Sequence, residues 1–147
     1  MNNNMRLSYQ YSFLVFLKNV LLGIVFLGVA WVRFSKFEPK WTFFEILTII
    51  VVLVFSILIG SQALYLCSAY LRNDKIVLKK LLRGEKTYTA KQIVSIKKIN
   101  MRGLHYVMVT MRNVDGTMER FMILNIYTWY AMSKYNAEEV LTELQKN

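Results

Sequence analysis

The chain has 147 residues, of which 55% are hydrophobic. This fraction exceeds the roughly 45–50% of a soluble globular domain, and 19 Lys and Arg against 9 Asp and Glu give a net charge of +10. Because Cys67 is the single cysteine, an intrachain disulfide and a cysteine zinc cluster are excluded. Composition therefore favours a basic protein with a membrane-embedded part.

The first apolar segment runs from about residue 11 to 32, long enough to cross a bilayer as a helix. Lys18 and Asn19 interrupt it near its start, where a lysine side chain reaches the lipid headgroups. A cleaved signal peptide is the alternative, because residues 28–30 (GVA) resemble a small-x-small cleavage site. We expect a retained transmembrane helix, since a bulky Trp31 would directly follow the cut.

The second apolar segment runs from residue 41 to about 66 and carries no charge over 46–60. The loop before it is so short that the two helices must form an antiparallel hairpin. Trp31 and Trp41 flank this loop, as interfacial anchors do. Small or polar residues four apart predict the contact between the helices. They are Asn19 and Gly23 on the first helix, and Ser56 and Gly60 on the second.

Basic residues gather directly after the second segment, namely Arg72, Lys75, Lys79, Lys80 and Arg83. Fewer basic residues occupy the loop between the two helices. The positive-inside rule therefore predicts a multi-pass protein of the cell (inner, cytoplasmic) membrane with both termini in the cytoplasm.

Residues 1–71 are thus expected to form the membrane part, and residues 72–147 a small α+β domain. In the latter, 14 Lys or Arg stand against 7 Asp or Glu. Alternating apolar residues predict an antiparallel sheet with strands near 75–82, 86–89, 93–101, 104–112 and 117–124. Turn residues separate the strands: Gly84, Arg102-Gly103 and the loop 113–116. Asn136, with Glu139 three residues later, predicts the start of a C-terminal helix over about 137–146.

The stretch KIVLKKLLRGEKTYTAKQIVSIKKI (75–99) and the closing AEEVLTELQKN resemble bacterial membrane-anchored pleckstrin-homology-like (PH-like) proteins. The resemblance extends over residues 10–147 in architecture and over about 35 residues in pattern. It implies a split or partly closed seven-stranded barrel, with the C-terminal helix at one end. It also implies binding or scaffolding rather than chemistry.

No pattern in the sequence requires an enzyme. His105 lies in a predicted strand, and Cys67 lies at a membrane edge with no orienting acid evident. Glu138 and Glu139 are adjacent on a helix and point to different faces. We find no nucleotide-binding motif or metal-ligand cluster, and therefore expect no catalytic residue, cofactor or metal.

The leading hypothesis is a membrane-anchored module whose basic face contacts anionic lipid. The candidate contacts are Lys75, Lys79, Lys80 and Arg83, followed by Lys97, Lys98 and Arg102. One alternative is an interaction or immunity-type protein that binds a membrane-protein partner, or another copy of itself, through a sheet edge. Another is an oligomeric pore or transport accessory. Nucleic acid is a less fitting partner, because no recognition motif is present.

Overall fold

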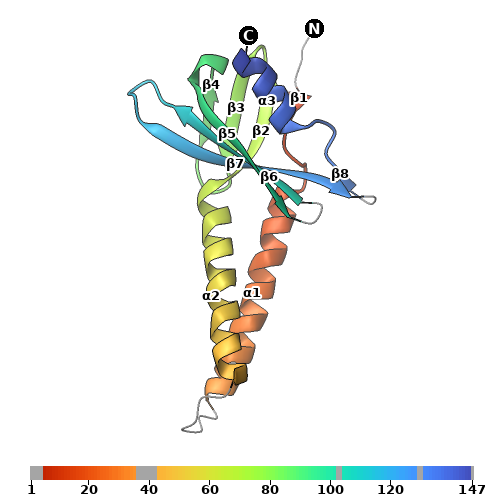
Figure 1. Ribbon diagram of the computed structural model, residues 1–147, viewed down its shortest axis with the longest axis vertical. Helices are drawn as coiled ribbons and strands as arrows, with labels where there is room; N and C mark the ends of the chain where they lie inside the picture. The colour runs from red at the N-terminus through yellow and green to blue at the C-terminus, as the bar shows by residue number, and fades with distance from the viewer. Residues whose placement is uncertain (1–4, 36–42, 102–103, 129–130, 147) are drawn as a thin grey trace. The chain divides into compact units, whose positions relative to one another are not determined.

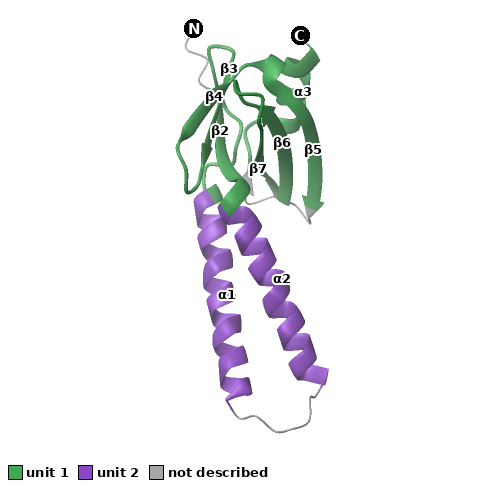
Figure 2. Cartoon of the chain, turned by 90° about the vertical axis from the view of Figure 1, so that its left-hand side faces the viewer, with its two compact units in different colours: residues 1–12, 64–147 green, residues 13–63 purple. Residues whose placement is uncertain are grey.

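The computed structural model describes residues 5–35, 43–101, 104–128 and 131–146 (Figure 1). The chain divides into two compact units: residues 13–63 form one, and residues 1–12 with 64–147 form the other (Figure 2). This division differs from the expected boundary between residues 71 and 72. Strand pairing is the reason, because residues 5–6 and 66–72 belong to the same sheet.

The first unit is a pair of helices, α1 (Ser12–Phe34) and α2 (Phe43–Tyr65), each of 23 residues. Their ends lie within two residues of the predicted segments. By length and composition both are able to cross a membrane. In the most apolar window, 11% of α1 and 0% of α2 is buried, unlike the core helix of a soluble protein. Trp41 lies outside the described residues.

The second unit is a curled sheet of eight strands, joined by a C-terminal helix (Figure 1). The strands are β1 (Met5–Arg6), β2 (Leu66–Arg72), β3 (Lys75–Lys80), β4 (Glu85–Tyr88), β5 (Ile93–Met101), β6 (Leu104–Arg112), β7 (Met118–Thr128) and β8 (Ala131–Met132). Their main order is β4-β3-β2-β7-β6-β5, with β1 beside β2 and β8 beside β7.

The expected all-antiparallel sheet requires one correction, because β2 and β7 run parallel and pair Leu66 with Met122 and Cys67 with Ile123. These strands are far apart in sequence, so no hairpin turn forces them to be antiparallel. β2 itself was not among the predicted strands, since its apolar residues continue the run of α2. The five predicted strands are present with ends shifted by up to four residues.

The core of the sheet domain joins both ends of the chain. Leu7, just after β1, is 0% exposed and lies in the same hydrophobic cluster as Leu141 of α3 (Ala137–Lys146). Buried Asn125 on β7 links them, because its Nδ2 donates to the carbonyl oxygens of Leu7 (2.8 Å) and Tyr135 (3.1 Å). The segment before α1 is therefore an integral part of this domain.

The C-terminal helix begins as predicted at Ala137, but its cap differs in detail. The Asn136 side-chain oxygen accepts the backbone N–H of Glu138 (3.2 Å) rather than that of the expected Glu139. The predicted turn over 113–116 is present between β6 and β7, with Gly116 at a φ of 82°. A short 3-10 helix, η1 (Ala90–Gln92), leads into β5.

Candidate functional site

The β2–β3 hairpin presents two chemically different faces. Register pairs Ala69 with Leu78 and Cys67 with Lys80, and these residues are buried. The alternate positions pair Arg72 with Lys75 and Ser68 with Lys79, where all three basic side chains are exposed. Because successive strand residues point to opposite faces, Lys79 and Lys80 lie on different sides of the sheet.

The inward face holds a compact charged cluster centred on Glu119 of β7. Lys80, 5% exposed, has its Nζ 2.7 Å from Glu119 Oε1. Lys86 of β4 has its Nζ 2.6 Å from Oε2. Tyr88 donates its hydroxyl to Asn113 Oδ1 at 2.8 Å, and the same hydroxyl lies 3.4 Å from Glu119 Oε2.

The surroundings of Glu119 favour its ionised form. Burial alone would raise the pKa of Glu119, but hydrogen bonds and charges from Lys80 and Lys86 outweigh it and lower the pKa to about 2. Burial and the Glu119 charge raise the pKa of Tyr88. Burial also raises the pKa of Cys67 to about 12, against the charge of Lys80. Of these shifts, the lowered pKa of Glu119 stabilises the fold near neutral pH, because the ionised carboxylate is favoured in the folded state.

The outward face carries cations around one aromatic ring. The guanidinium carbon of Arg6 lies 5.3 Å from the Tyr70 ring centroid, and that of Arg72 lies 5.4 Å from it. Arg6 is opposite Tyr70 across the β1–β2 pair, and Lys75 is opposite Arg72 across β2–β3. In the part of the chain that the structure describes, none of these three cations forms an ion pair with a carboxylate.

The turn between β3 and β4 lies where the chain leaves α2. Leu81 donates its backbone N–H to the carbonyl oxygen of Leu66 (3.0 Å), the residue directly after the end of α2. Next in the turn, Leu82 is 72% exposed. Exposed Arg83 follows Leu82 directly, and exposed Lys79 lies three residues before it on β3.

The seven predicted lipid-contact residues therefore separate into groups. Lys79 and Arg83 lie near the end of α2, whereas Lys75 lies at the opposite end of the hairpin. Lys80 is unavailable because it is buried with Glu119, and Lys98 is paired with Glu138 of α3 at 3.0 Å. Lys97 is exposed on β5. Arg102 lies outside the described residues.

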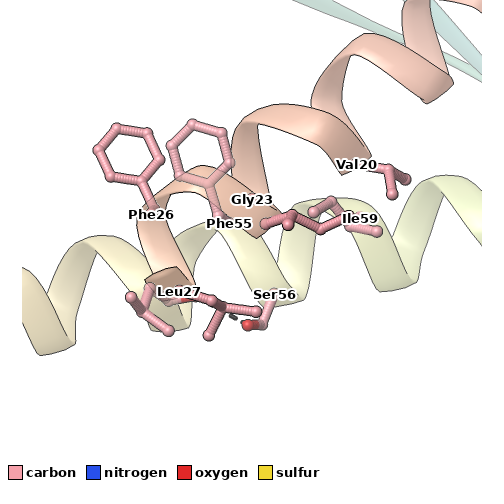
Figure 3. Close-up of a pocket in the computed structure, with 9 residues that line it drawn as sticks. Val20, Gly23, Phe26, Leu27, Phe55, Ser56 and Ile59 are labelled. Carbon is pink, nitrogen blue, oxygen red and sulfur yellow. Dashed lines mark hydrogen bonds between the residues drawn. The ribbon is translucent and has the colours of Figure 1, made fainter. Parts of the chain in front are cut away.

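The predicted helix-packing residues also differ in what they contact. A Cβ at Gly23 would lie 2.7 Å from Ile59 Cδ1, so the glycine permits a close approach there (Figure 3). A Cβ at Gly60 would meet nothing within 4 Å. Ser56 donates to the carbonyl oxygen of Val52 (2.8 Å) within its own helix. Asn19 donates to Gln62 Oε1 across the pair at 3.0 Å.

The cleft between α1 and α2 is lined almost entirely by apolar side chains. It is lined by Val20, Gly23, Ile24, Phe26, Leu27, Val52, Phe55, Ser56 and Ile59 (Figure 3). Trp31, a predicted interfacial anchor, is exposed near the end of α1. Such a surface suits acyl chains better than water.

The residues considered for catalysis, Cys67 and His105, pack against or bond to neighbouring side chains of the fold. Cys67 is buried in the core. His105 has its Nδ1 2.6 Å from Asn100 Oδ1 and its ring 5.0 Å from that of Tyr127. Over the described ranges, no group of three or more His, Cys, Asp or Glu side chains is arranged to hold a metal ion.

Comparisons with known proteins return no match among family models, curated proteins or solved structures. Sequence reasoning missed Arg6, Tyr70 and Glu119, which come together only through pairing of distant strands. One signal was available: in IVLKK, Lys80 alternates in phase with Ile76 and Leu78 and so belongs to the inward face.

Proposed function

We propose that this chain is a multi-pass protein of the cell membrane, and that its sheet domain is a non-enzymatic binding module resting on an anionic lipid surface. The observation that carries the proposal is the β3–β4 turn. Its exposed Leu82 follows Leu81, whose backbone N–H donates to the carbonyl oxygen of Leu66, the first residue after α2. Lys79 and Arg83 are the exposed cations nearest to Leu82 in the sequence. Each cation near an anionic surface contributes about 1 kcal/mol.

Support for two membrane crossings comes from the sheet domain as well as from hydropathy. Residues 1–12 and 64–147 form one folded unit, so they lie on the same side of any membrane that residues 13–63 cross. An antiparallel pair of spans meets this requirement. Cleavage after Ala30 would remove β1 and Leu7 from the domain, which favours an uncleaved first helix.

Aromatic residues support an interface at this end of the helix pair. Tyr11 precedes α1 and Tyr65 ends α2. Because the helices are antiparallel, both tyrosines belong to the same end of the hairpin. Tyrosine is enriched at headgroup level. Because basic residues are in excess after α2, we propose that this end of the helix pair faces the cytoplasm, as do both termini of the chain.

The domain belongs, in our proposal, with PH-like binding modules. In support, the sheet curls around a shared core, and α3 contributes Ala137 and Leu141 to that core. A module of this kind binds through its surface, and the exposed cations Lys79, Arg83, Arg72 and Lys75 support such a role.

The test uses the full chain in lipid nanodiscs with a fluorescent probe on Leu82→Cys. Cys67 is 1% exposed and its pKa is about 12, so the introduced thiol is labelled selectively. The matched control is a probe on Asp74→Cys, at the other end of the same hairpin. Quenchers are attached either to neutral or to anionic lipids.

We expect both lipid quenchers to quench the probe at position 82 more than the probe at 74, and the anionic quencher to be the stronger. The double variant K79Q/R83Q should abolish the preference for the anionic quencher while leaving the neutral quenching in place. Equal quenching at 82 and 74 would exclude the lipid contact. Quenching without any anionic preference would exclude the electrostatic part.

A further inference from the structure

A second cationic surface, made of exposed and half-buried residues, lies at the opposite end of the β2–β3 hairpin from Leu82. We call it the distal cluster and define it as Arg6, Tyr70, Arg72 and Lys75. β2 spans seven residues, so Arg72 lies about 20 Å along the strand from Leu66. This separation exceeds the screening length of roughly 8 Å in physiological salt. The distal cluster is therefore electrostatically independent of the β3–β4 turn.

The geometry of the distal cluster places two guanidiniums around one aromatic ring. The Arg6 and Arg72 guanidinium carbons both lie within 5.4 Å of the Tyr70 ring centroid. Lys75 joins them because Asn73 and Asp74, at φ of 48° and 58°, form the tight turn that sets it opposite Arg72. Asp74, the nearest acid in sequence, makes no ion pair within the described part of the chain. Bound carboxylates would supply the opposite charge that these cations lack.

Arg6 also carries an unsatisfied donor. Its Nη2 donates to the carbonyl oxygen of Gln10 at 3.0 Å, which fixes the orientation of the guanidinium. Its Nε is buried and has no hydrogen-bond partner within the described residues, so the half-buried Arg6 can meet a partner only through its terminal nitrogens. Guanidiniums held against an aromatic ring keep their N–H edges available for bidentate pairing with carboxylates.

We propose that the distal cluster is a docking site for an acidic peptide segment of a partner protein. The choice of a protein partner rests on the proposed function, because lipid headgroups would meet the β3–β4 turn at the other end of the hairpin. The cations lie on three neighbouring strands, so they match carboxylates spread along an extended chain. Tyr70 adds an apolar face between them.

The experiment measures binding of a fluorescent peptide of about ten glutamates to the full chain in nanodiscs of neutral lipid, by anisotropy. The test variant is R6Q/R72Q. The charge-matched control is K91Q/K97Q, which removes two exposed lysines from η1 and β5. We expect R6Q/R72Q to weaken binding about tenfold or more, and K91Q/K97Q less than about twofold.

Two further variants keep the result decisive. K75Q changes an exposed side chain and should weaken peptide binding about threefold even if R6Q/R72Q disturbs the fold. K79Q/R83Q should leave peptide binding unchanged, so a failure of the lipid proposal is separable from a failure here. Equal losses in R6Q/R72Q and K91Q/K97Q would overturn the docking site, as would an absence of saturable binding. If R6Q/R72Q instead lost binding to anionic vesicles, the proposed peptide partner would be wrong and lipid would be the ligand of the distal cluster.

Discussion

Lys79 and Lys80 are neighbours of the same type, yet the fold gives them opposite surroundings. Lys80 is 5% exposed and ion-paired to Glu119, while Lys79 faces outward and is exposed. The same division separates the inward cluster of Lys80, Lys86, Glu119 and Tyr88 from the outward cations of the hairpin. Charge density alone therefore does not define a binding surface, because the strand register decides which charges stabilise the fold and which remain available to a partner.

The largest expected effect comes from removing the centre of the inward cluster. Glu119→Gln leaves Lys80 buried without its counter-charge, which should destabilise the sheet domain by about 3–4 kcal/mol. Chemical denaturation of the full chain in detergent measures this. The control is Glu85→Gln on the exposed edge strand β4, which should change stability by less than about 0.5 kcal/mol. Equal effects of the two substitutions would contradict the division between the faces.

Leu7→Ala tests whether the segment before α1 belongs to the sheet domain. Because Leu7 is 0% exposed in the shared core, the substitution should cost about 2–4 kcal/mol. Leu82→Ala, at an exposed leucine, is the control and should leave stability nearly unchanged. The readout is again denaturation of the full chain. A neutral Leu7→Ala would mean that the N-terminal segment does not pack as described.

Acid should weaken the same inward cluster. The pKa of Glu119 in the fold is about 2, below its ordinary value of 4.5, so its contribution is fully present above pH 4.5 and is lost as pH falls toward 2. The loss should be on the order of 3 kcal/mol. Comparing the wild type with Glu119→Gln across this range isolates the effect. The difference between them should shrink as pH falls, and a constant difference would disagree with the depressed pKa.

The smallest effect is expected in the helix pair. Gly23→Ala should be near neutral or destabilise by up to about 1 kcal/mol, since the new Cβ meets the flexible tip of Ile59 at 2.7 Å. Gly60→Ala meets open space and should stabilise α2 by roughly 0.5–1 kcal/mol. Unfolding in mixed micelles by titrated SDS, followed by circular dichroism, compares them. A larger penalty at position 60 than at 23 would reverse the assigned packing.

Much of the architecture was predictable because local patterns determine it. The two apolar helices, the 113–116 turn and the C-terminal helix follow from run length, turn chemistry and periodicity. β1 and β2 were not predictable in this way. The apolar residues of β2 continue the run of α2, and the pairing of Arg6 with Tyr70 joins residues separated by the whole helix pair.

The candidate site was predicted only in part for the same reason. Lys79 and Arg83 were identified from their closeness to α2 in sequence, which the Leu81–Leu66 hydrogen bond preserves in space. Lys80 was predicted to contact lipid but is buried. A lysine in phase with Ile76 and Leu78 can be buried only if a carboxylate pairs with it. Its partner, Glu119, lies 39 residues away in sequence and could not be identified locally. Long-range strand pairing supplied that partner.

We propose that outward Lys79 serves binding, whereas inward Lys80 serves stability. The most direct test compares Lys79→Gln with Lys80→Gln in the full chain, recording both unfolding stability and the anionic-lipid preference of the probe at position 82. We predict that Lys79→Gln lowers the lipid preference without loss of stability, and that Lys80→Gln lowers stability by about 3 kcal/mol. Equal changes in stability and lipid preference for the two variants would contradict this division. So would a loss of stability in Lys79→Gln together with a loss of lipid preference in Lys80→Gln.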